Sequence, residues 1–185
     1  MYTHNAIWRI DVDLGGAANN SAMHVQHNEN PADPTGKAND AKTLISTAQG
    51  LTFDVRRHDG LAVKNPSLKN ARGDVSEYHL LPLIVGGGLT QHTEPFTQND
   101  FWVAPYNGVK FAARDLPAYV SGAPNVANTD IVLLYKGSLH HHPRDEDGVY
   151  NSSHNWIGTA HVMWAGFALI PHNFLDCAPF YKPCP

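Results

Sequence analysis

The segment Ile7–Asp13 has a period of two, which constrains the fold more than any other pattern in the chain. Side chains of a β-strand point alternately to opposite faces. One face would carry Ile7, Arg9, Asp11 and Asp13, and the other Trp8, Ile10 and Val12. This predicts a strand close to the start of the chain. An unpaired strand edge invites aggregation, so we expect this strand to belong to a larger sheet system.

The rest of the chain also predicts a mainly β fold. It has 185 residues, with 42% hydrophobic and 16% charged, which is typical of a globular domain with a substantial core. Four further runs are rich in aliphatic, aromatic and β-branched residues, namely Leu51–Val55, Glu77–Val85, Asp100–Ala104 and Asp130–Tyr135. There is no alternation of strand and helix signals, so several short strands with turn signals between them favour a β-sandwich.

Three segments receive separate predictions. Ile157–Ile170 is a longer apolar run that we interpret as one bent strand. Asn28–Asp40 contains two prolines and a glycine and is predicted to be an exposed loop, while Ala38–Gln49 could carry one short helix.

Charge and hydropathy exclude some classes of partner. The net charge is −4 and there is no run of Lys or Arg, which argues against nucleic acid or an anionic membrane as a partner. No apolar stretch approaches ~18 residues, and the first residues do not form a signal peptide. The location in the cell is not determined. Cys177 and Cys184 are either two unrelated thiols or a short disulfide loop.

Two segments far apart in the sequence combine histidine with acidic residues. The first runs from His4 to Asp13, and the second runs from Asn128 to Asp147 and contains His140–His142. Imidazole suits a borderline transition metal such as copper or zinc, whereas carboxylate and carbonyl oxygens suit calcium. Because side chains alternate along a strand, His141 would point away from its two histidine neighbours. Two metal sites of different chemistry could therefore form where these segments meet.

Six motifs in the same order give the chain a specific resemblance. They are Arg9–Asp13 followed by Asn20 and Ser21; Arg57, Asn65, Asn70, Gly73 and Tyr78; Phe101–Tyr106; Asn128–Val132; His141–Asp147; and Gly166–Phe174. From about His4 to about Pro179, the chain resembles the C-terminal part of the catalytic domain of the copper amine oxidases, which are quinone-dependent primary-amine oxidases. The resemblance implies that residues 1–185 form an incomplete piece of that family's β-sandwich (supersandwich), with no second domain.

The resemblance also implies metal ligands. The family binds copper through a His-x-His pair and a third histidine from a distant strand. The second histidine of the pair falls on His4, the third ligand falls on His141, and the first position is occupied by Tyr2. A neutral phenol is a poorer copper ligand than imidazole at pH 7. The family's peripheral calcium-like site falls on Asp11, the Val12 carbonyl, Asp13, Asp130 and the Ile131 carbonyl.

The catalytic groups of the family are not found in these 185 residues. The family makes topaquinone from the tyrosine of an Asn-Tyr-Asp/Glu motif and uses an aspartate base, both upstream of the histidine pair. The chain has no Asn-Tyr dipeptide, so it encodes neither the quinone nor any catalytic residue that we can assign. The resemblance further implies a homodimer, with residues 104–130 largely forming a loop that reaches toward the second subunit. The parent enzyme would be extracellular or peroxisomal.

Three interpretations of the function remain open. The chain is a copper-binding C-terminal fragment of an amine oxidase, inactive alone, whose partner is the N-terminal part of the enzyme. The parent reaction would convert a primary amine, O2 and water to an aldehyde, ammonia and H2O2. Alternatively, the chain is a non-catalytic metal-binding or assembly module that retains the calcium-like site. The third interpretation is a small independent copper enzyme that uses His4 and His141.

Overall fold

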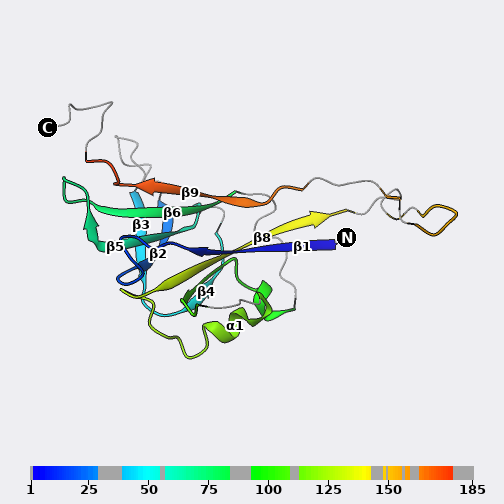
Figure 1. Cartoon of the computed structure of the whole chain (residues 1–185), viewed down its shortest axis with the longest axis horizontal. Coiled ribbons are helices and arrows are strands. Elements are labelled where there is room, and N and C mark those ends of the chain that lie inside the picture. The colour runs from blue at the N-terminus through cyan, green and yellow to red at the C-terminus, as the bar shows by residue number, and fades with distance from the viewer. Residues whose placement is uncertain are drawn as a thin grey trace.

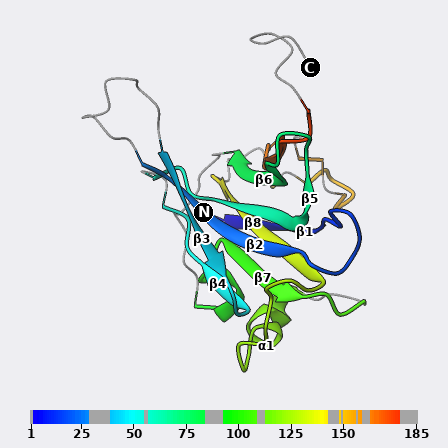
Figure 2. The same cartoon turned by 90° about the vertical axis from the view of Figure 1, so that its left-hand side faces the viewer.

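Two antiparallel β-sheets form the molecule. The computed structural model describes residues 2–28, 39–54, 57–83, 93–108, 113–142, 148, 150–155, 157–158 and 163–176. The first sheet has the strand order β1-β8-β7-β4, and the second has the order β3-β2-β5-β6-β9 (Figures 1 and 2). The strands of the first sheet are β1 (Tyr2–Asp11), β8 (Ile131–His141), β7 (Phe101–Pro105) and β4 (Gln49–Leu51). Those of the second are β3 (Asn39–Ile45), β2 (Ser21–Asn28), β5 (Gly60–Lys69), β6 (Val75–Leu83) and β9 (Gly166–His172). The predicted sandwich is confirmed.

The main hydrophobic core lies between the two sheets. Alternate residues of β7 and β8, such as Phe101, Leu133 and Tyr135, face Leu61 and Leu80 of the second sheet. These side chains are at most 5% exposed. The period of two therefore decides which residues of each strand enter this core.

A second, smaller core covers the other face of the first sheet. It contains the intervening residues Trp102, Val132 and Leu134, together with Leu116 of α1. Helix α1 (Leu116–Tyr119) and the 3-10 turns η2 (Pro95–Thr97) and η3 (Ala113–Asp115) lie on this side. Because β7 and the first half of β8 are buried on both faces, Phe101–Pro105 and Ile131–Tyr135 are continuous apolar runs and do not alternate.

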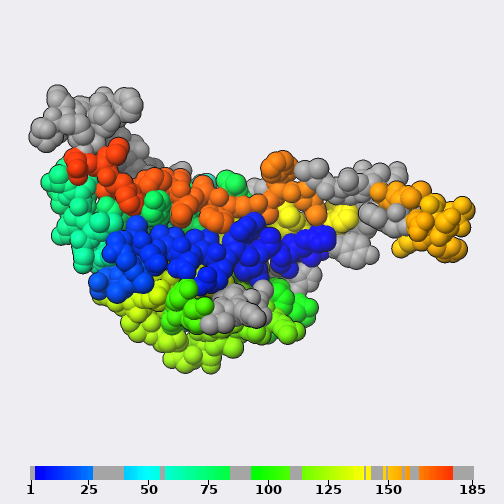
Figure 3. Space-filling model, in the orientation of Figure 1, coloured from blue at the N-terminus to red at the C-terminus, as the bar shows by residue number. Residues whose placement is uncertain are grey.

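Strands β1 and β8 form a long two-stranded ribbon that contains both predicted metal-binding segments. They pair from Tyr2 opposite His141 to Asp11 opposite Val132, and they lie side by side in Figure 1. Figure 3 shows β1, in blue, at the surface along this ribbon. Trp8 stacks on Tyr135, with ring centroids 5.5 Å apart. It also covers Gly137, where an added Cβ would lie only 2.9 Å from the indole.

Two of the predicted elements are wrong. Residues 39–45 form strand β3 instead of a helix, because pairing with β2 gives this segment backbone hydrogen bonds along its whole length. The segment 157–170 is not one bent strand. Only Gly166–His172 forms a strand, where it pairs with β6, and residues 157–158 and 163–165 are not in strands.

Other predicted segments agree in part with the structure. Of the strand predicted at Leu51–Val55, only Leu51 lies in a strand (β4), residues 52–54 do not, and Val55 is outside the described residues. The predicted exposed loop falls mostly on residues 29–38, which are also outside them. Beyond β7, the described residues up to Asp130 contain only η3, α1, turns and isolated bridges, as expected for a loop-rich segment. Cys177 and Cys184 lie outside the described residues. Within the described residues, no helix is long and apolar enough to cross a membrane.

Candidate metal sites

The acidic residues predicted to bind calcium come together at one end of the β1–β8 ribbon. One carboxylate oxygen from each of Asp11, Asp13 and Asp130 lies within 4.8 Å of the other two. Asp11 is the last residue of β1, and Asp130 immediately precedes β8. The cationic side chain of Arg9 contacts this cluster. Its guanidinium lies 3.5 Å from the Asp11 carboxylate and over the ring of Tyr106.

Side-chain amides fix the backbone around this acidic cluster. The Leu14 amide donates to Asn20 Oδ1, and Asn20 Nδ2 donates to the carbonyls of Gly16 and Ala17. These bonds close the turn that follows Asp13. Ser21 Oγ and Asn128 also hydrogen-bond each other, at 3.1 and 2.8 Å, which ties the start of β2 to the approach to β8. These hydrogen bonds give a structural role to the Asn20–Ser21 and Asn128–Asp130 motifs, which hold the backbone around the acidic cluster.

The Asp130 carboxylate lacks a partner that would neutralise it. Its Oδ1 atom is buried and has no hydrogen-bond partner. Burial raises the pKa of Asp130, and the negative charges of Asp13 and Asp11 raise it further, against a smaller opposing effect of Arg9. Orphaned buried oxygens and repelling carboxylates are the features that a bound hard cation would relieve.

The predicted copper ligands meet at the opposite end of the same ribbon. The rings of His4 and His141 stack with their centroids 5.8 Å apart and an interplanar angle of 28°. His4 lies opposite Leu139, and Tyr2 lies opposite His141, so positions 2, 4 and 141 share one face of the ribbon. Seven residues of strand separate His4 from Asp11, or roughly 24 Å at ~3.4 Å per residue. The two sets are therefore independent sites.

These two imidazoles meet only part of the requirement for a copper site. They are suitable ligands for a borderline divalent metal. They are, however, one histidine short of the set implied by the family resemblance, because the third position holds Tyr2. Among the described residues, no third histidine, cysteine or carboxylate completes a cluster with them.

A third cluster was not predicted from the sequence. Glu77 and His79 on β6 and His172 on β9 each place one ligand atom within 4.8 Å of the others. His79 Nε2 lies 3.0 Å from Glu77 Oε1, and the rings of His79 and His172 stack with centroids 3.8 Å apart. Lys42 on β3 also contacts the Glu77 carboxylate. The spacing Glu-x-His on a strand places both side chains on one face, which is the signal that could have indicated half of this cluster.

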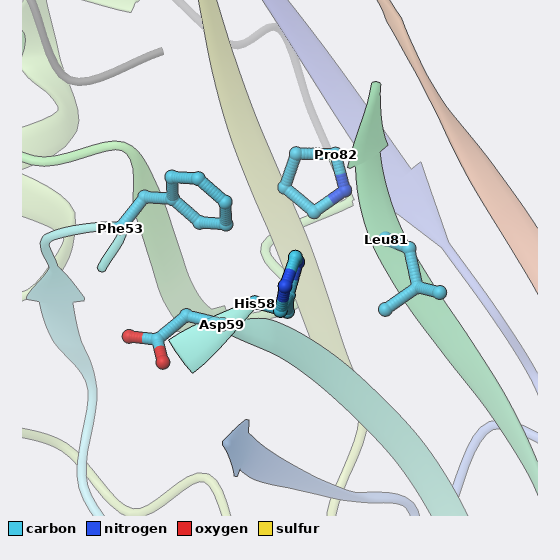
Figure 4. A pocket seen from close by; sticks show the side chains of 5 residues that line it. All are labelled: Phe53, His58, Asp59, Leu81 and Pro82. Carbon is cyan, nitrogen blue, oxygen red and sulfur yellow. The ribbon is translucent and has the colours of Figure 1, made fainter. Parts of the chain in front are cut away.

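One small pocket lies away from all three clusters. It has a volume of about 130 Å³ and is lined by Phe53, His58, Asp59, Leu81 and Pro82. Figure 4 shows the Asp59 carboxylate directed away from Leu81 and Pro82. That carboxylate already accepts hydrogen bonds from Gln26 and the Asp54 amide and lies 3.1 Å from His24 Nε2. The pocket therefore offers little polar chemistry for a ligand.

Comparison with known proteins identifies the family. The family model described as "Copper amine oxidase, enzyme domain" matches residues 1–183. The chain belongs to the copper amine oxidase family. It is 27% identical over 210 residues to "Amine oxidase [copper-containing] gamma 1" of Arabidopsis thaliana, which covers 100% of the chain and 28% of that relative. It is also 27% identical over 201 residues to "Primary amine oxidase" of Arthrobacter sp. (strain P1), covering 97% of the chain and 29% of that relative.

Solved structures of copper amine oxidases share the fold. A copper-containing benzylamine oxidase from Hansenula polymorpha superposes with a TM-score of 0.69 at 17% identity, covering 96% of the chain and 30% of that protein. The lysyl oxidase of Pichia pastoris gives a TM-score of 0.63 at 18% identity, covering 95% and 26%. The chain thus spans less than a third of the length of these relatives and corresponds to part of the copper amine oxidase enzyme domain.

Proposed function

We propose that these residues form the C-terminal portion of the catalytic domain of a primary-amine oxidase and supply two of its copper ligands, His4 and His141. The observation that carries the proposal is the stacking of these two rings on one face of the β1–β8 ribbon. Copper in this family supports quinone formation and oxygen chemistry. The chain's own residues would hold the ion at the end of the ribbon, while the quinone and the base would come from sequence outside these 185 residues.

Copper binding tests the proposal directly. Losing one imidazole from a three-histidine site weakens the site by orders of magnitude, so Cu(II) should bind weakly to the 185-residue chain. The Tyr2→His variant should bind at least ~10-fold more tightly, because it restores the third imidazole. His141→Ala should abolish this binding. His140→Ala is the matched control, since residue 140 pairs with Thr3 and is one register position away from His141.

The proposal fails if wild type and His141→Ala bind Cu(II) with equal affinity. It also fails if Tyr2→His gains nothing, since residue 2 would then lie outside the site. A separate activity measurement tests the expected lack of catalysis. Copper-loaded, aerated protein should release no peroxide from benzylamine or methylamine and develop no phenylhydrazine-sensitive visible band, because it lacks the Asn-Tyr motif.

We also propose that Asp11, Asp13 and Asp130, with the carbonyls of Val12 and Ile131, bind calcium. Five protein oxygens with one or two waters would reach the six to eight ligands that calcium prefers. The buried, unpartnered Oδ1 of Asp130 supports a cation at this position. The ion would link the end of β1 to the start of β8 and stabilise both. As in the family, the whole enzyme would be a homodimer.

A second function is favoured by the difference between these two ligand sets. The acidic set is complete, whereas the imidazole set has Tyr2 in place of a histidine. A non-catalytic metal-binding or assembly module would need only the acidic set. The sequence directly upstream of Met1 distinguishes the two functions. An in-frame Asn-Tyr-Asp motif there supports the oxidase, and an in-frame stop codon supports the module.

A further inference from the structure

The cluster of Glu77, His79 and His172 has the composition of a transition-metal site. We propose that these three residues bind a borderline divalent ion, for which Zn²⁺ is the probe. None of them is a ligand in the copper or calcium proposals. Two imidazoles and one carboxylate are a known ligand set for zinc, with water completing the tetrahedron. The site would join β9 to β6, and the inference is independent of any oxidase activity.

Strand register brings the three donors together. Glu77 lies directly opposite His172 in the β6–β9 pair, and His79 follows Glu77 by two residues on the same face. Their ligand atoms already lie within 4.8 Å of one another. In a tetrahedral zinc site with bonds of ~2.0–2.2 Å, ligand atoms are about 3.4 Å apart. The required contraction is small, although the stacked rings must tilt so that both ring planes point at the ion.

One buried nitrogen in the cluster lacks a hydrogen-bond partner. The side chain of His79 is only 5% exposed, and its Nε2 has no hydrogen-bond partner even though Glu77 Oε1 lies 3.0 Å away. The two atoms lie at the distance of an ion pair, but no hydrogen bond joins them in the structure. Buried polar atoms without partners are rare in folded proteins and call for an explanation such as an ion. A metal between the two atoms would satisfy both.

Burial and neighbouring charges act on two residues of the cluster. Burial lowers the pKa of His172, and the adjacent His79 contributes to the same effect. Burial raises the pKa of Glu77, but contacts with His79 and Lys42 outweigh this effect and lower the pKa to about 2.

Lys42 is the competitor for the same carboxylate. Its ammonium contacts Glu77 Oε1, and an ion pair alone would explain why Glu77 is buried and charged. The Lys42–Glu77 ion pair still leaves His79 Nε2 buried without a hydrogen bond. The side chain of Lys42 is 33% exposed, so its ammonium can move into solvent when a divalent ion replaces it. The ion-pair explanation and the metal explanation therefore predict different effects of removing Lys42 on zinc binding.

Zinc titration of the 185-residue chain, with excess calcium present to occupy the acidic cluster, tests the proposal. Wild type should bind Zn²⁺ at this site, and Co²⁺ in its place should give the intense visible absorption of a tetrahedral complex. The His172→Ala substitution should weaken binding by about 10-fold or more. Lys42→Met should tighten it, because the competing ammonium is gone. The His4→Ala/His141→Ala double variant should keep the site, and His154→Ala is the control for an exposed histidine on a turn.

Three results would overturn the proposal. The first is equal zinc affinity in wild type and His172→Ala. The second is loss of the tetrahedral cobalt spectrum in the His4→Ala/His141→Ala variant alone. The third is unchanged or weaker zinc binding in Lys42→Met with circular dichroism identical to wild type, which would mean that Glu77 serves only the ion pair. Because Lys42 is partly exposed, this variant keeps the test valid even if His172→Ala fails to fold.

Discussion

Substituting Lys136 with methionine should destabilise the chain strongly. Lys136 lies on β8, and its side chain is only 3% exposed. Its Nζ donates a hydrogen bond of 2.6 Å to the Thr97 carbonyl and lies 3.4 Å from Asp100 Oδ1. Asp100 precedes β7, and its Oδ2 accepts a hydrogen bond from the Phe53 amide. The lysine thus neutralises the buried Asp100 carboxylate where β4, β7 and β8 meet.

The expected loss is about 3–4 kcal/mol of unfolding free energy. Removing one partner of a buried ion pair costs ~3–5 kcal/mol, because the other charge stays buried and uncompensated. Asp100 is 11% exposed and keeps one hydrogen bond, which places the loss toward the lower end of that range. Methionine preserves the aliphatic contacts of the lysine, so the loss of unfolding free energy measures the contribution of the ammonium group. Total stabilities of ~5–15 kcal/mol mean that the variant should still fold.

Urea unfolding followed by tryptophan fluorescence would measure the loss. The slope of the unfolding free energy against urea concentration should equal that of wild type, since the variant and wild type expose the same additional surface on unfolding. Lys69→Met is the control on an exposed residue and should change stability by less than ~0.5 kcal/mol. The double variant Lys136→Met/Asp100→Asn should lose less than the two single losses added together. A loss below ~1 kcal/mol in Lys136→Met, or strict additivity in the double variant, would refute this account.

Three further outcomes are expected. Millimolar calcium should raise the melting temperature of wild type by mass action, and an equal rise in Asp11→Asn/Asp130→Asn would place the ion elsewhere. Burial and the charge of Asp100 raise the pKa of Tyr135 from 10 to about 12. Wild type should therefore lose roughly 3 kcal/mol more stability than Tyr135→Phe as pH rises from 10 through 12, and parallel pH curves in urea unfolding would contradict this. Apolar side chains such as Trp164, which is 76% exposed, should make the isolated chain self-associate, whereas a monodisperse monomer in light scattering would argue against it.

The sequence predicted the sandwich but missed three of its strands, β2, β5 and β3, the last of which was predicted as a helix. Strand β2 contains several polar residues, including His24 and Gln26, whose side chains are satisfied by Asp59 of a neighbouring segment. That partner is 33 to 35 residues away in the chain, so no local pattern could reveal it. Strand β5 contains Pro66, and a proline weakens the strand signal of a segment because it cannot donate to the β-ladder. The pairing with β6 shifts register between Lys64 and Lys69, and a proline is tolerated in such an irregularity.

Prediction of the metal sites depended on how close together their ligand residues lie in the sequence. The acidic cluster draws two of its three carboxylates from one short segment, and the resemblance to the family supplied Asp130. The Glu77–His79–His172 cluster draws its third residue from β9, which lies almost a hundred residues further on. Only the β6–β9 register reveals that contact. The family resemblance found ligands on different strands, such as His4 and His141, but it gave no indication of the cluster that the β6–β9 register brings together.

The two predicted metal-binding sets depend on one register. His4 and His141 lie on the same face of the ribbon as Trp8 and Tyr135, which enter the main core, whereas Asp11 lies on the opposite face. A slip of β1 by one residue would exchange these faces. The packing of Trp8 on Tyr135 and against the core opposes that slip, because the slip would move the indole to the opposite face. The packing of Trp8 in the core thus sets the geometry at both ends of the ribbon, although Trp8 itself is in neither ligand set.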